Sequence, residues 1–156
     1  MDSDSFRAVL GRFASGITVV TAIGPNGRDH GMTVSAFCSL SLEPPMILTC
    51  IGHDAQMHDM LVNGEHFVVN ILAAGQEAVA RRFAGPDPDR FDGIGFTRGR
   101  TGIAFLEDAL AHIECRRGAT HEGGDHTIIT GEVLHAEVRP DRPLLYYRGG
   151  YAQLER

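Results

Sequence analysis

A row of hydroxyl side chains lies in the segment GMTVSAFCSLSLEPP, from Gly31 to Pro45. Ser and Thr alternate there with apolar residues, and side chains of a strand alternate between its faces, so the pattern predicts one hydroxyl face and one apolar face. Hydroxyl groups donate and accept hydrogen bonds, so this face, which also carries Phe37, could hold the polar chain and flat ring of a cofactor. A half-exposed strand with Ser and Thr in water would give the same pattern.

A second candidate site is Gly123-Gly124-Asp125-His126-Thr127, placed before a long apolar strand pattern. Paired glycines let the backbone turn sharply and approach a ligand closely. His126 could hydrogen-bond a carboxamide, supply a proton or lie over a planar ring. A turn histidine that is satisfied by Asp125 or by the backbone is the alternative.

Other spacings that could carry chemistry are incomplete. His112-Ile113-Glu114-Cys115 matches half of a zinc deaminase signature, but the P-C-x-x-C half is absent, and a strand with a polar outer face is the favoured interpretation. His53 and His58 have no third ligand nearby in the sequence, so we assign no metal. No G-x-S-x-G, P-loop or G-x-G-x-x-G follows an expected strand, which argues against serine hydrolase, nucleotide phosphatase and Rossmann dehydrogenase sites.

The elements that would position these residues are mostly strands. Hydrophobic periodicity predicts strands at 17–23, 31–42, 46–51, 67–72, 109–116, 127–138 and 144–151. Asn26-Gly27 favours a tight antiparallel hairpin between the first two of them. Six or more strands with few helices indicate a mainly β protein, built as a closed or nearly closed antiparallel barrel.

Short helices are expected at the N-terminus, at 55–62 and at 76–83. Asp4 would cap the first helix and Gly16 would end it. The segment 84–100 is rich in Gly, Pro, Asp and Arg, which indicates a long surface loop that could act as a lid or a subunit contact.

Composition narrows the class of protein further. A chain of 156 residues fits a single domain, 1–156, with a sizeable core. The formal net charge of −6 leaves no basic stripe, so we expect no nucleic-acid partner. The apolar runs are too short to cross a membrane and the first residues do not resemble a secretory signal, so we expect a cytoplasmic protein. Cys38, Cys50 and Cys115 are expected to be buried, reduced thiols.

Several of these segments together resemble the flavin reductase family, which has a flavin-binding split-barrel fold. The segments that carry the resemblance, in the family's order and spacing, are FASGITVVTA, GMTVSAFCSLSLEPPMILTC, FVVNIL, RRFAG, GGDHTIITGEV and PLLYYRGGYAQL. The GDHT loop followed by G-E-V and the terminal Tyr-Tyr-Arg-Gly-Gly-Tyr are the most specific in combination. The match covers nearly the whole chain and implies a mainly β, antiparallel split β-barrel with a few short helices.

The resemblance also implies a function. Members of the family use NADH or NADPH to reduce FMN or FAD, supply the reduced flavin to a partner monooxygenase, and are typically homodimers with flavin at the subunit interface. A non-catalytic flavin carrier on the same barrel is the alternative, against which the Gly124-Asp125-His126 loop argues. An enzyme similar to pyridoxamine-phosphate oxidase should show a basic cluster, which this acidic chain offers little of.

By the same resemblance, His126 with Asp125 matches the position close to the nicotinamide, where His126 would orient the ring for hydride transfer. The hydroxyl face would surround the flavin, and backbone N–H groups there would stabilise the charge that reduction adds, without an acid–base pair. The flavin-binding residues that the resemblance implies are Thr33, Val34, Ser35, Ala36, Ser39, Leu40, Ser41, Cys50, Ile51, Gly52, Arg82, Phe83, Ala84 and Tyr151.

One departure from the family affects the flavin phosphate. Many relatives carry an S-x-T pattern that helps to hold it, whereas this chain reads His53-Asp54-Ala55-Gln56-Met57 and lacks both hydroxyls. Either flavin binds more weakly, as suits a diffusible substrate, or its phosphate rests on Arg82 or on backbone amides. The choices between FMN and FAD and between NADH and NADPH stay open, as does the identity of the partner monooxygenase.

Overall fold

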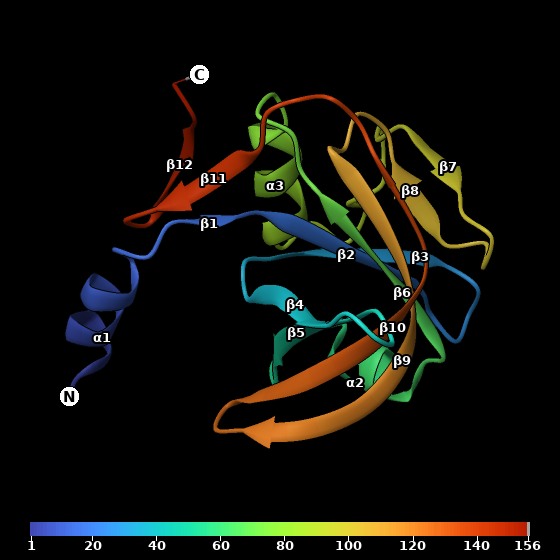
Figure 1. The fold of residues 1–156 in the computed structure, drawn as a ribbon, viewed down its shortest axis with the longest axis horizontal. Helices are drawn as coiled ribbons and strands as arrows, with labels where there is room; N and C mark the ends of the chain where they lie inside the picture. Colours follow the sequence, from blue (N-terminus) through green and yellow to red (C-terminus); the bar gives the residue numbers. More distant parts are fainter. Residues whose placement is uncertain (156) are drawn as a thin grey trace.

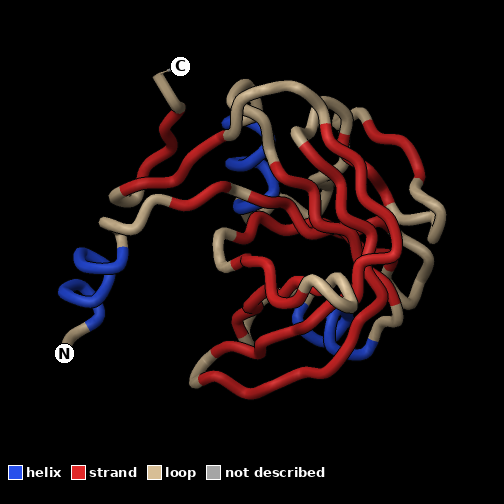
Figure 2. The backbone as a smooth tube through the Cα atoms, in the orientation of Figure 1, coloured by secondary structure: helices blue, strands red, loops and turns tan. Residues whose placement is uncertain are grey.

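The computed structural model describes residues 1–155, and most of them form antiparallel strands (Figures 1 and 2). The helices are α1 (Ser3–Leu10), α2 (His58–Asn63) and α3 (Glu77–Ala84). The strands are β1 (Ser15–Gly16), β2 (Thr18–Ile23), β3 (Asp29–Val34), β4 (Phe37–Ser41), β5 (Met46–Gly52), β6 (His66–Ile71), β7 (Phe96–Arg98), β8 (Ala104–Leu106), β9 (Ala111–Gly123), β10 (His126–Val138), β11 (Leu144–Tyr147) and β12 (Gly150–Gln153).

The largest sheet has the strand order β3-β2-β6-β9-β10-β5-β4, and neighbouring strands run antiparallel. Its two edge strands, β3 and β4, are consecutive in the chain and are joined only by Ser35 and Ala36. Two residues cannot span an open seven-stranded sheet, so the edges come together and the sheet curls on itself (Figure 1). The expected mainly β, antiparallel split-barrel fold is therefore confirmed.

The two-residue link corrects one expectation from the sequence, because 31–42 is not a single strand. In β3, Val34 is buried in the core, whereas in β4 the core residue is Phe37, three positions later. Cys38 and Leu40, expected on a buried apolar face, are exposed. The link thus shifts the alternation by one residue and reverses which parity faces the core.

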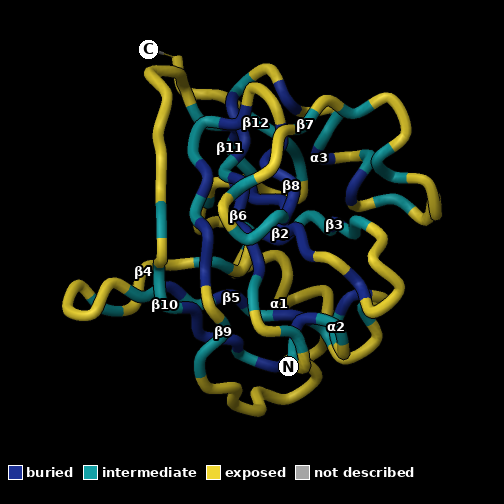
Figure 3. The backbone as a smooth tube through the Cα atoms, turned by 90° about the vertical axis from the view of Figure 1, so that its right-hand side faces the viewer, coloured by how far each residue is buried: buried dark blue, intermediate teal, exposed yellow. Residues whose placement is uncertain are grey.

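Two of the three clusters of buried apolar side chains among the described residues are large, and the third is Val68 with Ile103 and Phe105. One fills the curl of the large sheet with side chains such as Val20, Ile51, Phe67 and Ile129. The other lies under α3, where Phe83 packs with Ile17, Leu72 and other apolar residues. Figure 3 shows that buried backbone is concentrated in the strands of the large sheet, while the connecting loops are exposed.

The β7–β8 hairpin, which we call the flap, covers part of β6 and β9 and buries polar side chains that the sequence had suggested were outward-facing. Glu114 is fully buried and accepts hydrogen bonds from the backbone N–H of Thr101 (2.6 Å), the Thr101 hydroxyl (2.5 Å) and the backbone N–H of Arg100 (3.2 Å). His112 is also buried and stacks on Phe105 at 4.6 Å. The expectation of a polar outer face was wrong, because the flap covers it.

A buried asparagine fastens the flap from beneath. The Asn70 side-chain NH₂ donates to the Val19 carbonyl at 2.9 Å, and its oxygen accepts from the Leu106 N–H at 2.9 Å. Burial without such partners would be costly, so the amide fixes β8 against β2 and β6.

The N-terminal helix, β1 and the β11–β12 hairpin form a unit that we call the arm, which extends away from the barrel (Figure 1). The expected helix is present, but Asp2 caps it through Ser5, and it ends at Gly11. The expected strand 144–151 is instead a hairpin, since Arg148 and Gly149 have φ of 53° and 77° and turn the chain back. None of the α1 residues is buried.

Other boundaries differ less. β5, β6, β10 and α3 lie within one residue of their expected limits, but β9 continues to Gly123, well beyond the expected end at Arg116. Among the cysteines, Cys115 is buried as expected, Cys50 is partly buried and Cys38 is exposed, which corrects the expectation for Cys38. Within residues 1–155, no helix is long and apolar enough to cross a lipid bilayer.

Candidate functional site

The His126 ring lies at the tip of the β9–β10 hairpin. Gly124 adopts φ of 66°, which allows the tight turn, and His126 Nδ1 donates to Asp125 Oδ1 at 2.7 Å. This hydrogen bond lowers the pKa of the Asp125 carboxyl below its usual value. His126 pairs in register with Gly52 of β5, where an added Cβ would lie 3.7 Å from His126 Nε2. Both sequence hypotheses for His126 are compatible with this geometry, because the ring is held by Asp125 and still exposed.

Polar contacts hold this tip from the residue after β5 and from α2. The His53 N–H donates to the Asp125 carbonyl at 2.9 Å, and His53 Nε2 lies 2.8 Å from Glu122 Oε2. The buried Thr127 hydroxyl donates to Glu122 at 3.2 Å and lies 2.8 Å from His58 Nε2. Sequence reasoning missed Glu122, and it did not predict that His53 and His58 would contact this tip.

The end of β5 brings a second group of expected site residues beside His126. The Cys50 N–H donates to the Ala36 carbonyl at 2.9 Å, so the Ser35–Ala36 link lies against Cys50, while Gly52 of the same strand pairs with His126. Burial raises the pKa of the Cys50 thiol, as does the nearby Cys38. The side chains of Val34 and Ile51 are buried in the core, which leaves only their backbone groups for a ligand.

A third group surrounds a hollow of about 180 Å³ between β3, α3 and the segment before α2. The Thr33 hydroxyl donates to the Ala80 carbonyl at 2.7 Å and ties β3 to α3. Phe83 packs over Gly31, where an added Cβ would lie 2.6 Å from its ring. The residues that line the hollow are Met32, Thr33, Ala55, Gln56, Met57, Phe83, Ala84 and Arg90.

Two arginines organise the loop beside this hollow. Arg82 donates to the carbonyls of Arg90 (2.8 Å) and Asp89 (2.9 Å). Arg90 in turn donates from Nη1 to Gly31 (2.8 Å) and from Nη2 to Gly85 (2.6 Å), while its buried Nε has no partner among the described residues. The Arg90 guanidinium, with N–H groups that make no hydrogen bond within the described residues and with apolar side chains beside it, suits a flavin that carries a phosphate.

Other expected site residues lie apart from these groups within one chain. Tyr151 packs in the arm, with its ring 4.9 Å from the Arg81 guanidinium carbon and 5.5 Å from the Tyr146 ring. Figure 1 shows β12 at the upper left and the tip of the β9–β10 hairpin at the lower left. Ser39, Leu40 and Ser41 lie on the edge strand β4, with Ser39 and Leu40 exposed.

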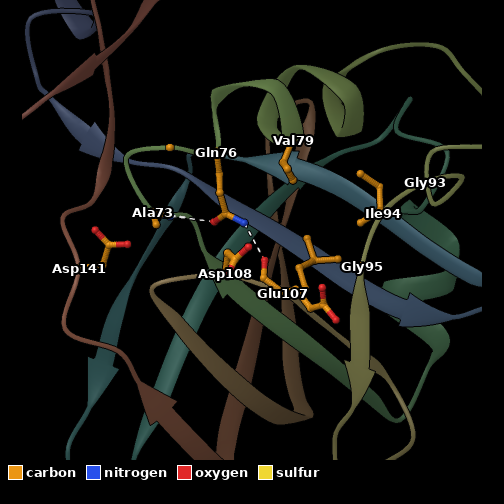
Figure 4. A pocket seen from close by; sticks show the side chains of 11 residues that line it. Ala73, Gln76, Val79, Gly93, Ile94, Gly95, Glu107, Asp108 and Asp141 are labelled. Carbon is orange, nitrogen blue, oxygen red and sulfur yellow. Dashed lines mark hydrogen bonds between the residues drawn. The ribbon is translucent and has the colours of Figure 1, made fainter.

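A larger hollow of about 380 Å³ lies elsewhere and contains none of the expected site residues (Figure 4). The Gln76 side chain crosses it, bonded to the Ala73 N–H and the Glu107 carbonyl. Its charged lining side chains are Glu107, Asp108 and Asp141, which would repel a phosphate. We therefore place the candidate site at the smaller hollow and the His126 tip. In the described part of the chain, no three His, Cys, Asp or Glu residues gather as metal ligands would.

Known proteins are similar to this chain over nearly its whole length. Residues 10–155 match the model of the flavin reductase like domain. The chain is 40% identical over 156 residues to the flavin-dependent monooxygenase reductase subunit HsaB of Rhodococcus jostii, covering 99% of this chain and 80% of that protein. It is 39% identical over 155 residues to an FMN reductase (NADH) of Agrobacterium fabrum, covering 99% and 88%.

A solved structure is similar over the same length. The NADH:FAD oxidoreductase of Streptomyces globisporus, in complex with NAD and FAD fragments, superposes with a TM-score of 0.94 at 41% identity. The match covers 98% of this chain and 93% of that one.

Proposed function

Because the chain belongs to the flavin reductase like domain family, we propose that it transfers a hydride from NADH or NADPH to FMN or FAD and supplies the reduced flavin to a separate monooxygenase. The observation that carries the proposal is the hollow between β3 and α3, where the orphaned Arg90 donor and apolar walls fit a phosphorylated flavin. Within this proposal, residues 1–156 act as one domain, and the protein works in the cytoplasm.

The proposed flavin contacts come from three segments. Thr33, Phe83 and Ala84 line the hollow, the Ser35–Ala36 link offers backbone groups beside Cys50, and Gly52 at the end of β5 offers them beside His126. When bound, the flavin ring supplies the hydride-accepting chemistry, so the protein needs no acid–base pair of its own. Fixed N–H groups near the ring would stabilise the added negative charge.

We assign the nicotinamide to the His126 tip. The His126 ring is exposed, and its Nδ1 is held by Asp125, so the ring has a fixed orientation, while Nε2 has no hydrogen-bond partner among residues 1–155 and could bond a carboxamide. The contribution of His126 to the rate is then positioning of the two rings.

We propose that a second copy of the chain packs against the arm. The apolar side chains of Phe6, Val9, Leu10 and Phe13 recur at helical spacing, and they are 55%, 61%, 51% and 80% exposed. A face of this kind is costly in water and is typical of a subunit interface. A homodimer would cover it, and it would explain why β12, which carries Tyr151, lies away from the tip of the β9–β10 hairpin of the same chain (Figure 1).

The first test is anaerobic mixing of the protein with NADH or NADPH in the presence of FMN or FAD, followed by absorbance of the oxidised flavin. Rapid bleaching supports the reductase and gives both cofactor preferences. Binding of flavin without bleaching would favour a flavin carrier, and no binding would contradict both.

The His126→Ala variant tests whether His126 positions the nicotinamide ring or contributes to flavin binding. We expect His126→Ala to slow reduction of bound flavin by about a hundredfold, with flavin affinity nearly unchanged, because only ring orientation is lost. His121→Ala is the matched control, since His121 is an exposed histidine on the same hairpin. A parent-like reduction rate in stopped-flow measurements would remove His126 from the site.

A further inference from the structure

We infer that Arg90 binds the phosphate at the end of the flavin's ribityl chain, in place of the Ser and Thr hydroxyls that this chain lacks at 53–57. The inference rests on the proposed function and assigns one of its subsites. Ala55, Gln56 and Met57, from the segment without the hydroxyls, line the same hollow as Arg90. The segment in which relatives carry the hydroxyls and the Arg90 side chain therefore border the same hollow.

The charge of Arg90 is available to a ligand. Arg90 is the only charged residue among the described residues that line the hollow. In the described part of the chain, no carboxylate lies within 4.0 Å of its guanidinium nitrogens, whereas arginines such as Arg98 and Arg116 have acidic partners. In a protein with a formal net charge of −6, an unneutralised cation beside apolar walls is a local site for an anion.

The guanidinium is also held in place before any ligand binds. The carbonyls of Gly31 and Gly85 accept from Nη1 and Nη2, which uses two of its five N–H groups. Since each terminal nitrogen carries a second N–H, one on each remains for phosphate oxygens. A fixed cation loses little side-chain entropy on binding, which strengthens its interaction.

Arg82 has a different role in this arrangement. Its two hydrogen bonds go to carbonyls of the loop, at Asp89 and Arg90, so Arg82 holds the loop that carries Arg90, and Arg82 is not among the residues that line the hollow. We therefore assign Arg82 as a positioning residue for Arg90, rather than as the phosphate ligand that the sequence suggested. Asp54, the acid of the altered segment, does not line the hollow and leaves the phosphate unopposed there.

The test measures affinity for riboflavin, FMN and FAD by flavin fluorescence, without nicotinamide. We expect the wild-type protein to prefer FMN and FAD over riboflavin. Arg90→Gln should weaken FMN and FAD by about tenfold and riboflavin by less than about twofold, since only the phosphorylated flavins lose a charge-assisted hydrogen bond. Arg116→Gln is the control, because it removes one positive charge from an exposed pair with Glu132.

Arg90→Lys keeps the charge without the fork and should retain part of the preference. If Arg90→Gln fails to fold, the lysine variant and the salt dependence of the wild type decide: added salt should weaken FMN binding and spare riboflavin. Equal wild-type affinity for riboflavin and FMN, or an effect of Arg90→Gln on FAD but not FMN, would overturn the inference and leave the proposed function standing. No affinity for any flavin would overturn the proposed function as well.

Discussion

The flap and the arm both lie outside the curled sheet, but they differ in what they leave uncovered. The flap buries polar groups and satisfies them within the chain, as Glu114 and Asn70 show. The arm leaves apolar side chains in water and buries none of α1. The polar groups of the flap are thus satisfied within a single chain, whereas the exposed apolar side chains of the arm are the basis of the homodimer that we propose.

The largest effect on the free energy of unfolding is expected at the flap. Glu114→Ala should destabilise the protein by about 3 kcal/mol, because it leaves buried donors of Thr101 and Arg100 without an acceptor and opens a void. Urea unfolding measures the change. Glu132→Ala is the control, since its exposed pair with Arg116 should contribute less than about 1 kcal/mol. Equal losses for both variants would mean that the flap is not fixed by Glu114.

Substitutions in the arm should change self-association and not the free energy of unfolding of one chain. Replacing Phe6 and Phe13 by Ser should weaken self-association by about tenfold or more and leave the unfolding of one chain nearly unchanged, since neither ring is buried there. Sedimentation equilibrium measures the association. Ile23→Ser, which also changes an exposed apolar side chain but at the far end of β2, should not alter it. A wild-type protein that stays monomeric at all concentrations would contradict the proposed homodimer.

The pH dependence of the free energy of unfolding tests whether Glu114 is ionised in the flap. Burial alone would raise the pKa of Glu114, but hydrogen bonds from Thr101 and Arg100 outweigh it and lower that pKa below its usual value of 4.5, with a smaller effect of His135. A carboxyl with a lowered folded-state pKa contributes stability above its unfolded pKa and loses it as pH falls through the folded value. The stability difference between wild type and Glu114→Gln should therefore shrink below about pH 4.5. A constant difference, measured by urea unfolding across this range, would exclude an ionised Glu114.

The smallest expected effect is a gain in stability at the turn of the arm. Arg148 has φ of 53° and is followed by Gly149 at 77°, a pair of positive φ values that Asn-Gly adopts more readily. Arg148→Asn should raise the free energy of unfolding by about 0.5 kcal/mol. Arg142→Asn, at a position without positive φ, should give no gain. A loss of stability in Arg148→Asn would mean that the arginine side chain itself supports the turn.

Much of the fold could be predicted where one local pattern decides the structure. β5, β6 and α3 have strong apolar periodicity and lie close to their expected bounds. The burial of Glu114 could not be predicted, because the strand pattern does not reveal that a short hairpin from another part of the chain covers it. The break after β3 had one local signal, since Phe37 is an aromatic residue on the parity otherwise occupied by hydroxyls.

The candidate site was predicted in part for the same reason. The His126 tip depends on glycines and a turn that the sequence displays, and it was expected. Arg90 was not, because it lies in an irregular loop where nothing periodic indicates the direction of a side chain. Its role depends on carbonyls of Gly31 and Gly85, and such backbone acceptors have no sequence signature.

The Ser35–Ala36 link has a consequence for insertions and deletions. Its extra residue lets the chain leave β3 beside β2 and enter β4 beside β5, with Phe37 still directed to the core. With one residue deleted, Val34 and Phe37 would fall on the same parity, as in one uninterrupted strand. Such a strand would continue along β2 instead of crossing to β5. The length of this link is therefore more constrained than its composition, and relatives should vary its residues more freely than their number.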